Sequence, residues 1–472
     1  MHTSLERRVG LAGATALNII EMVGVGPFIT IPLIVHAMGG PQAMLGWLFG
    51  AVFALSDGMV WAELGAMFPR AGGSYEYLKE AYGPRWGRAL AFMYVWQTSF
   101  SAPMSIASGC VGFAQYGSFI FPALTKVFFA RSWQLHLPAI GIFRMEWSFG
   151  ATSVLAMSIC ALAIVVCYRG IANVAAIAKL LVIGVLGTAL WVLVAGALHF
   201  NRNLAFDFPP NAFSGSTAFF QGLGAATLIA IYDFWGYYNV NFFGGEVLRP
   251  ERNVPRAIVI SIFVVGSLYL SMNLCILGVV PWRSLDSSRN FTVSLMMQSI
   301  YGTLAGRVAA ALVMWTAFAS VVSVLTGITR VGYAAARDGN YFRSLAHLHP
   351  ARRFPDTSLL ALGSVAVIFC TLRLQDLITA LVVMRILLQF LAQAIGLLKI
   401  RSGTRSGPRP FRMPLYPLPV IMAILGYIFV LISRPNAGRE IVLCVVIALL
   451  GAAIYAVMVK RRAATASSSH CL

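Results

Sequence analysis

Two apolar stretches of the sequence contain the residues with the clearest chemical potential. The first, "EMVGVGPFITIP" (21–32), places a carboxylate, two glycines and two prolines inside an apolar run from 11 to 35. The second, "IAIYDFWGYYNVNFFGGEV" (229–247), places an aspartate among aromatic residues, asparagines and glycines. Glycine and proline interrupt helices, and the backbone groups that are freed there can bind a carboxylate, an ammonium or a small cation. Both stretches are therefore candidate binding sites for a small polar molecule.

The elements that must position these residues are membrane-spanning helices. Hydrophobic residues make up 59% of the 472-residue chain and charged residues only 11%, whereas about a quarter of an ordinary soluble domain is charged. The net charge of +19 does not indicate nucleic-acid binding, because the basic residues lie between apolar segments and not on one soluble face. The sequence predicts a multi-pass protein embedded in a lipid bilayer, with no nucleic-acid partner.

Twelve apolar segments are separated by polar or Gly/Pro-rich breaks, and a spanning helix needs about 20 apolar residues. With the N-terminus in the cytoplasm, 23 of the 35 Lys and Arg residues fall in inner segments, nine in outer segments and three within spans. This bias predicts that both termini are cytoplasmic. We expect the membrane to be the plasma membrane. The segments are 11–35, 41–68, 87–114, 150–168, 171–198, 216–245, 256–280, 298–334, 357–374, 376–400, 414–433 and 439–459.

An interrupted helix is tolerated in a membrane only where the freed backbone lines a cavity or contacts protein. Gly24 to Gly26 free the backbone, and Pro27 suits the first turn of a new helix. For this stretch alone, a proline kink without a ligand is the alternative. However, paired interruptions in the first and sixth segments are typical of a secondary transporter site. The two stretches together therefore favour a binding site.

Three further stretches carry a resemblance to a known family. They are "WAELGAMFPRAGGSYEYLKEAYG" (61–83), "GGEVLRPERNVPRAI" (244–258) and "RVGYAAARDGNYFRSLAHLHPARRFPDTSLL" (330–360). In these motifs the chain resembles the amino acid–polyamine–organocation superfamily of secondary transporters, collinearly from about residue 8 to 400. The resemblance implies an all-α integral membrane protein with twelve transmembrane helices. Ten form a five-plus-five inverted repeat with broken helices 1 and 6, and two are accessory.

On this architecture the chain divides into five parts. The predicted boundaries are 1–10 for a cytoplasmic N-terminus, 11–198 for the first half of the repeat, 216–400 for the second half, 414–459 for the accessory helices and 460–472 for a cytoplasmic tail. The longest outer segment, 115–149, is moderately apolar, and we expect it to lie on the membrane surface.

The resemblance also implies how the first break binds substrate. In this superfamily the glycine-rich break binds the substrate carboxylate through backbone N–H groups, and Gly24, Val25 and Gly26 occupy it here. Val25 stands where the family often has a serine, so a hydroxyl contact is lost. The substrate amine meets carbonyls of the two breaks, which the resemblance places at Met22 and Tyr232; Tyr232 is also the expected aromatic gate.

Two residues of the second break depart from the family pattern. Asp233 and Trp235 stand where small residues are common, and they complete the expected substrate-binding set. Asp233 lies within the aromatic break, which favours a role in the site. Tyr94, Trp96 and Gln97 of the third segment are further candidates for its lining.

Charged residues within spans require an explanation, because each costs at least about 2.5 kcal/mol on insertion scales. The resemblance places Lys179 where sodium-driven relatives bind a cation and implies a role in proton coupling, with Ser320 and Ser323 as partners of its ammonium. The alternative is a structural ammonium that fixes the first break to the fifth helix. Glu21 can likewise attract an amine or carry a proton, or else pair with Lys179 or cap backbone amides.

The remaining motifs exclude several functions. The chain contains no G-x-x-x-x-G-K-[ST] loop for nucleotide and no HExxH motif, so neither a primary pump nor a zinc-dependent enzyme is indicated. The seven cysteines show no metal-ligand or redox spacing, and no metal or cofactor is expected. The predicted function is sodium-independent secondary transport of amino acids by alternating access, proton-coupled or by exchange. A transporter of polyamines or other cationic amines, and a non-transporting amino-acid sensor, are the alternatives.

Overall fold

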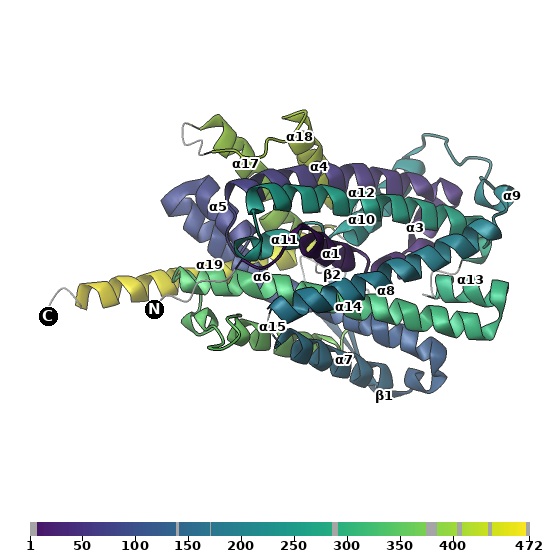
Figure 1. Ribbon diagram of the computed structural model, residues 1–472, viewed down its shortest axis with the longest axis horizontal. Helices are drawn as coiled ribbons and strands as arrows, with labels where there is room; N and C mark the ends of the chain where they lie inside the picture. Colours follow the sequence, from purple (N-terminus) through teal and green to yellow (C-terminus); the bar gives the residue numbers. More distant parts are fainter. Residues whose placement is uncertain are drawn as a thin grey trace.

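Long helices run mostly along the long axis of the molecule (Figure 1). The computed structural model describes residues 7–137, 141–169, 171–285, 291–373, 385–403, 408–432 and 437–468. The elements before residue 216 are α1 (Leu11–Met22), α2 (Gly26–Ile29), α3 (Ile31–Met38), α4 (Met44–Met67), α5 (Ser74–Tyr82), α6 (Arg88–Ile120), β1 (Val127–Leu137), β2 (Gly141–Gly150), α7 (Ala151–Cys167), α8 (Ile171–Leu198) and α9 (Arg202–Ala205). Those after it are α10 (Thr217–Phe234), α11 (Asn239–Phe242), α12 (Pro250–Leu277), α13 (Thr292–Tyr301), α14 (Thr303–Arg337), α15 (Asp356–Phe369), α17 (Ala392–Ser402), α18 (Leu418–Ile432) and α19 (Ala437–Ser468).

The first predicted interruption is present in the structure. Helix α1 ends at Met22 and α2 begins at Gly26, with Pro27 as its second residue. A proline is tolerated there because the first amides of a helix have no intrahelical acceptor. A second short discontinuity follows at Thr30, after which α3 continues to a left-handed glycine cap at Gly39.

The second predicted interruption is present as well. The side chain of Ser216 caps the start of α10 by accepting a hydrogen bond of 3.2 Å from the backbone N–H of Phe219. The helix ends at Phe234, where the chain turns extended at Trp235. Gly236 then adopts a φ of +127°, which L-residues with a side chain rarely adopt, before the short helix α11 begins.

Helices long and apolar enough to cross a membrane occupy many of the predicted ranges. Among the described residues six such segments are found: Leu11–Ile29, Pro41–Met67, Ala176–Leu198, Thr217–Phe234, Pro250–Leu277 and Thr303–Arg337. Helices α7, α15, α18 and part of α19 are shorter apolar helices, and α6 covers the third predicted segment. Part of the tenth segment, 376–400, lies outside the described residues. The count of twelve spans stays a prediction.

The outer segment 115–149 corrects the expectation of an all-α fold. It contains the end of α6 and most of an antiparallel hairpin, in which β1 pairs with β2 from Val127 opposite Gly150 to Leu137 opposite Gly141. Its strands, "VFFARSWQLHL" and "GIFRMEWSFG", are rich in aromatic residues, which pack well on a pleated surface. The apolar character that suggested a surface segment thus belongs to two short strands.

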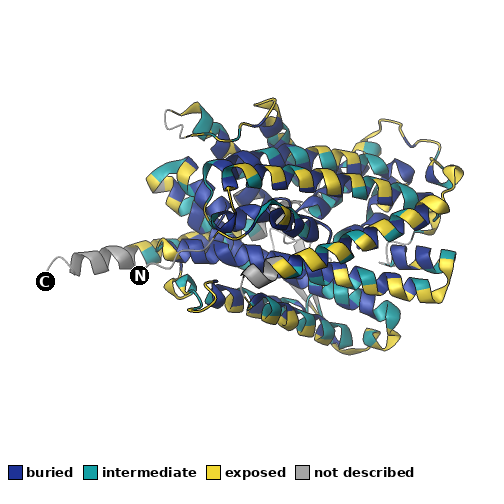
Figure 2. Ribbon diagram, in the orientation of Figure 1, coloured by how far each residue is buried: buried dark blue, intermediate teal, exposed yellow. Residues whose placement is uncertain are grey.

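The broken helix α1 lies at the centre of the bundle. It contacts α12, α14, α8 and the short helix α11, while α12 packs on α4 and α14 packs on α6. Figure 2 shows buried residues along α1 and α11 and exposed residues along the outward faces of α8 and α12. Both interruptions therefore lie in the interior, where surrounding helices can satisfy their backbone groups.

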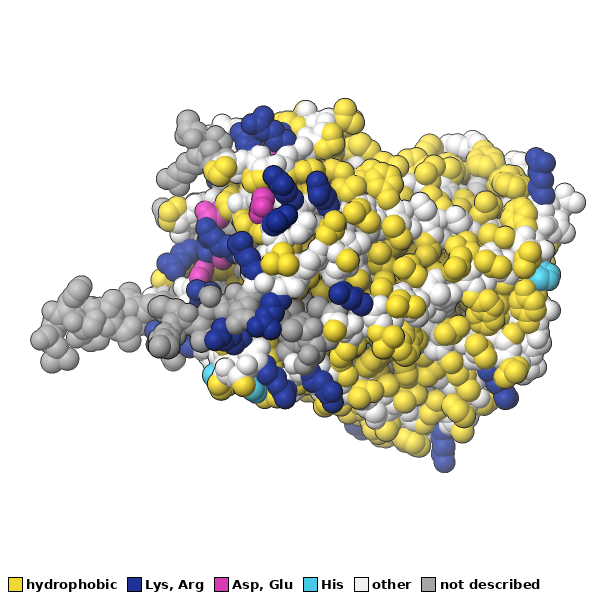
Figure 3. All heavy atoms as spheres, viewed as in Figure 1, with side chains coloured by type: hydrophobic (Ala, Val, Ile, Leu, Met, Phe, Trp, Pro, Cys, Tyr) yellow, Lys and Arg dark blue, Asp and Glu magenta, His cyan; other side chains and the backbone are white. Residues whose placement is uncertain are grey.

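The two ends of the bundle differ in charge. On the face in Figure 3, Lys and Arg side chains gather at the end that carries α5 and α17, while hydrophobic side chains cover much of the rest. Helix α19 also leaves the bundle at that end (Figure 1). There the N-terminal segment is pinned, because the backbone N–H of Val9 donates to Glu246 O at 2.9 Å. The Glu246 carboxylate in turn forms a buried ion pair of 2.8 Å with Arg330.

Candidate functional site

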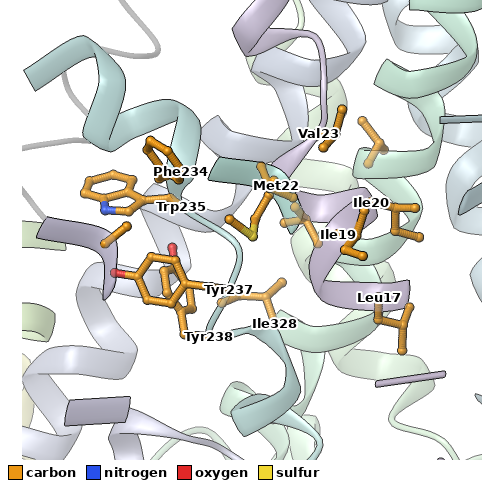
Figure 4. Close-up of a cluster of buried hydrophobic side chains, with 14 of the residues drawn as sticks. Leu17, Ile19, Ile20, Met22, Val23, Phe234, Trp235, Tyr237, Tyr238 and Ile328 are labelled. Carbon is orange, nitrogen blue, oxygen red and sulfur yellow. The ribbon is translucent and has the colours of Figure 1, made fainter. Parts of the chain in front are cut away.

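The two interruptions are in direct contact with each other. A Cβ atom on Gly236 would lie 2.8 Å from the backbone N of Met22 and 2.9 Å from the carbonyl carbon of Glu21. The buried side chain of Asn18 joins the same segments: its Nδ2 donates to Tyr237 O at 2.6 Å, and its Oδ1 accepts from the backbone N–H of Val240 at 3.0 Å. Figure 4 shows Met22 and Val23 beside the chain that carries Phe234 and Trp235.

Neighbouring helices satisfy the carbonyl groups that the interruptions free. The hydroxyl of Tyr269 on α12 donates to Met22 O at 2.6 Å and lies 3.3 Å from Asp233 O. From α14, Ser323 donates to Leu17 O at 2.8 Å and Ser320 to Glu21 O at 3.3 Å. The two serines thus bind backbone of the first broken helix, and not the ammonium of a lysine as expected from the sequence. Side chains of α12 and α14 thus bind backbone carbonyl groups at or near both breaks.

A small cavity of about 60 Å³ lies between the two breaks. One water molecule needs at least on the order of 10–15 Å³ of such space, so the cavity is large enough for water or a small polar solute. All the residues predicted to bind substrate line it: Met22, Gly24, Val25, Gly26, Tyr232, Asp233 and Trp235. Glu21 lines it as well, so the structure gathers two stretches about 200 residues apart in sequence around one space.

Several polar atoms at this cavity are buried without a partner. Among the described residues, Glu21 Oε2, Asp233 Oδ1 and Trp235 Nε1 make no hydrogen bond. The other carboxylate oxygen of Asp233 accepts a hydrogen bond from the hydroxyl of Thr30. A buried polar atom without a partner costs about 1–3 kcal/mol. Two free acceptors and one free donor at the same cavity therefore indicate a site for a solute that supplies the missing bonds.

The cation at the cavity is Arg385. Its side chain is 6% exposed, and Nη1 donates to the hydroxyl of Tyr238 at 3.1 Å. The guanidinium carbon lies 5.8 Å from the centre of the Trp235 ring, within the range of a cation–π interaction. The cavity thus holds one cationic and two acidic side chains, which matches the mixed charge of a zwitterion better than a uniformly cationic solute.

The predicted gate, Tyr232, spans the cavity from α10 toward α6. Its hydroxyl lies 3.4 Å from Ser108 Oγ, and its ring centre lies 6.2 Å from that of Trp235. The contact with Ser108 ties the aromatic ring to the opposite wall.

Lys179 is not brought to this site. Its side chain is exposed, as are those of Leu180 and Ile183, and it is not among the residues that line the cavity. The reason is the orientation of α8: the side of this helix that faces the bundle carries Ala178, Leu181 and Val185, which are buried, and Lys179 lies on another side. The structure thus gives the predicted coupling role of Lys179 no contact with the cavity, and that role stays a prediction. The cation that lines the cavity together with Glu21 is Arg385.

The third segment contributes other residues than expected. Ser105, Ser108 and Gly109 of α6 line the cavity, whereas Tyr94, Trp96 and Gln97 lie two to four turns closer to the start of that helix. Trp96 instead donates from Nε1 to Ile447 O on α19 at 2.9 Å. Small residues carry little signal in an apolar helix, so only the packing of α6 identifies them.

The chain is similar in sequence to known amino acid transporters. Residues 9–460 match the sequence profile of the family described as "Amino acid permease". The chain is similar to the serine/threonine exchanger SteT of Bacillus subtilis, at 24% identity over 98% of this chain and 100% of the relative. It is also similar to the human b(0,+)-type amino acid transporter 1, at 25% identity over 96% of this chain and 88% of the relative. A third relative is the branched-chain amino acid permease BcaP of B. subtilis, at 23% identity over 91% of this chain and 88% of the relative.

Proposed function

Because the chain belongs to the amino acid permease family, we propose that it transports small amino acids across the plasma membrane as a sodium-independent secondary carrier. The observation that carries this proposal is the cavity between the two breaks, where acceptors of Glu21 and Asp233 and a donor of Trp235 are left without partners. An α-ammonium would satisfy the two acceptors. The substrate carboxylate would bind at the backbone of Gly24–Gly26, which lines the same cavity.

The size of the cavity favours a small substrate. A volume of about 60 Å³ suits an amino acid with a short side chain better than one with a long side chain. Tyr232 and Trp235 line the same cavity, and their ring centres lie 6.2 Å apart. The relative named as a serine/threonine exchanger supports a substrate of this size.

A polyamine or another cationic amine is the second candidate, because the two acids could each bind an ammonium group. Arg385 weakens this candidate, since its buried guanidinium lines the same cavity and repels a second cation. A zwitterion brings a carboxylate that offsets this repulsion. The geometry therefore ranks amino acids before polyamines.

The arrangement in the membrane is part of the proposal. Twelve spans, with a repeat of 11–198 and 216–400 and accessory helices at 414–459, would place both termini in the cytoplasm. The interruptions in α1 and α10 and the gathering of Lys and Arg at the end where α19 leaves the bundle support this orientation. Alternating access would then move the broken helices against α6 and α14, with Tyr232 as the gate.

Transport in proteoliposomes tests the proposed function. Vesicles with the purified protein are loaded with unlabelled serine, and uptake of radiolabelled serine is measured in sodium or choline buffer, with and without an inward proton gradient. We expect equal uptake in both buffers, and stimulation by internal serine or by the proton gradient. Uptake that requires sodium would contradict the proposed coupling. Binding without uptake would identify a sensor, and competition by putrescine but not by serine would favour the amine alternative.

Replacement of Glu21 by Gln is expected to change coupling. Glu21 lines the cavity, and Gln keeps its shape but cannot exchange a proton. If Glu21 carries the coupled proton, uptake driven by a proton gradient is lost while exchange of internal for external substrate persists. The measurement compares these two modes in the same vesicles. Equal proton-driven uptake by the variant and the unmodified protein between pH 5 and 8 would remove Glu21 from coupling.

A further inference from the structure

Three cysteines that are far apart in sequence meet inside the bundle. Cys110 of α6, Cys160 of α7 and Cys370 at the end of α15 are all buried, and their sulfur atoms lie within 4.8 Å of one another. Their separations in sequence show no metal-ligand pattern, so the prediction of no metal site overlooked them. Three converging thiols form a set of soft ligands, which select ions such as Cu(I) over hard cations.

The geometry suits three-coordinate binding. With a metal–sulfur distance of about 2.3 Å, as for zinc thiolates, three sulfur atoms around one ion lie about 4.0 Å apart. The observed limit of 4.8 Å requires only a small contraction, which side-chain rotation can supply. The three residues come from three different helices, so an ion would join α6, α7 and α15.

The surroundings determine which charge the site accepts. Cys110 and Cys160 are 0% exposed and Cys370 is 2% exposed, and a net charge in such an interior is costly. A monovalent ion bound by one thiolate and two thiols is neutral, with one proton released to solvent: M⁺ + 3 RSH gives M(SR)(HSR)₂ + H⁺. A divalent ion would need a second thiolate for the same neutrality.

We propose that Cys110, Cys160 and Cys370 form a binding site for a soft monovalent metal ion of the Cu(I) class. Helix α6 contributes to both sites, because Cys110 follows Gly109, which lines the proposed substrate cavity. The metal site is nevertheless built from other residues than the cavity. Metal binding can therefore be measured whether or not the protein transports amino acids.

The test uses silver(I), which shares the charge and softness of Cu(I) and is stable in air. A background variant with Cys275, Cys444 and Cys471 replaced by Ser keeps the three clustered thiols and Cys167. The reduced, detergent-purified protein is incubated with silver nitrate in chloride-free buffer containing 1 mM glutathione. The bound silver is then determined by elemental analysis after dialysis. We expect one silver ion per chain and a rise in the thermal unfolding temperature.

Cys160→Ser and Cys167→Ser are the matched pair. Both positions are buried on α7, but the Cys167 sulfur contacts Val322 O and Thr326 on α14 and is not one of the three sulfur atoms that lie within 4.8 Å of one another. Loss of one of three linked ligands should lower the affinity by roughly 100-fold or more. We therefore expect Cys160→Ser to lose the silver ion and Cys167→Ser to keep it.

Two results would overturn the proposal. One is that the background variant retains no silver when glutathione competes for the ion. This measurement needs no further substitution. The other is equal retention by Cys160→Ser and Cys167→Ser. If Cys160→Ser does not purify as a folded protein, Cys370→Ser replaces it, because Cys370 lies at the end of α15 and not within a helix.

Discussion

Replacement of Asp233 by Asn is expected to abolish amino acid uptake while the protein remains folded. The Asp233 side chain is 3% exposed; one oxygen accepts a hydrogen bond from Thr30, and the other has no partner among the described residues. Asn keeps the shape and can still accept from Thr30, but it presents an amide N–H₂ group to the substrate ammonium. Loss of a hydrogen bond to a charged group costs about 1.5–3 kcal/mol. We expect binding to weaken by roughly 10- to 150-fold, before any repulsion between the two donors.

The stability of this variant distinguishes a binding role from a structural one. A buried carboxylate without a cationic partner destabilises the fold, so its replacement by a neutral amide should leave the unfolding temperature unchanged or raise it. Uptake in proteoliposomes and thermal unfolding of the detergent-purified protein are measured on the same preparation. Thr30→Val is the control, because it removes the donor to Asp233 and keeps the charge; we expect a smaller loss of uptake. Normal uptake by Asp233→Asn across the pH range would contradict the proposed site.

The sequence was informative where the signal is local. Glycine and proline in an apolar run disturb a helix wherever they occur, so the breaks at Gly24 and Gly236 could be located without a structure. Their pairing followed from their positions in the first and sixth segments. The residues beside these breaks, including Asp233 and Tyr232, then line the cavity because chain neighbours of a break must lie near it.

The sequence was uninformative where the answer depends on how helices rotate and pack. Apolar residues surround Lys179 on every side of α8, so no hydrophobic period shows which side faces the bundle. Arg385 reaches the cavity only because its helix packs beside the second break, 147 residues from its hydrogen-bond partner Tyr238. The three clustered cysteines have the same origin. In each case the contact that matters joins residues that are far apart in the chain. A single sequence carries no signal that pairs such residues.

Gly236→Ala is expected to have the largest effect of any single methyl addition at the site. The backbone φ of +127° at Gly236 is unfavourable for alanine, and a residue held in such a sparsely populated region costs about 1–3 kcal/mol. The added Cβ would also lie 2.8 Å from Met22 N and 2.9 Å from Glu21 C, and both are backbone atoms that cannot rotate away. Overpacking of this kind costs a further 1–3 kcal/mol or so. We expect the two breaks to separate, with loss of uptake and a fall of several degrees in the unfolding temperature.

Gly302→Ala separates the two causes of this effect. Gly302 also has a positive φ, +87°, but a Cβ there would meet no atom within 4 Å. It therefore reports backbone strain alone, and the additional loss in Gly236→Ala measures the contact between the breaks. Thermal unfolding of both variants gives the difference, and serine uptake shows whether it matters for transport. Equal stability and equal uptake of the two variants would show that the close approach of Gly236 to Met22 does not hold the site together. The cavity would then owe its shape to Asn18 and Tyr269, whose hydrogen bonds join the same two segments.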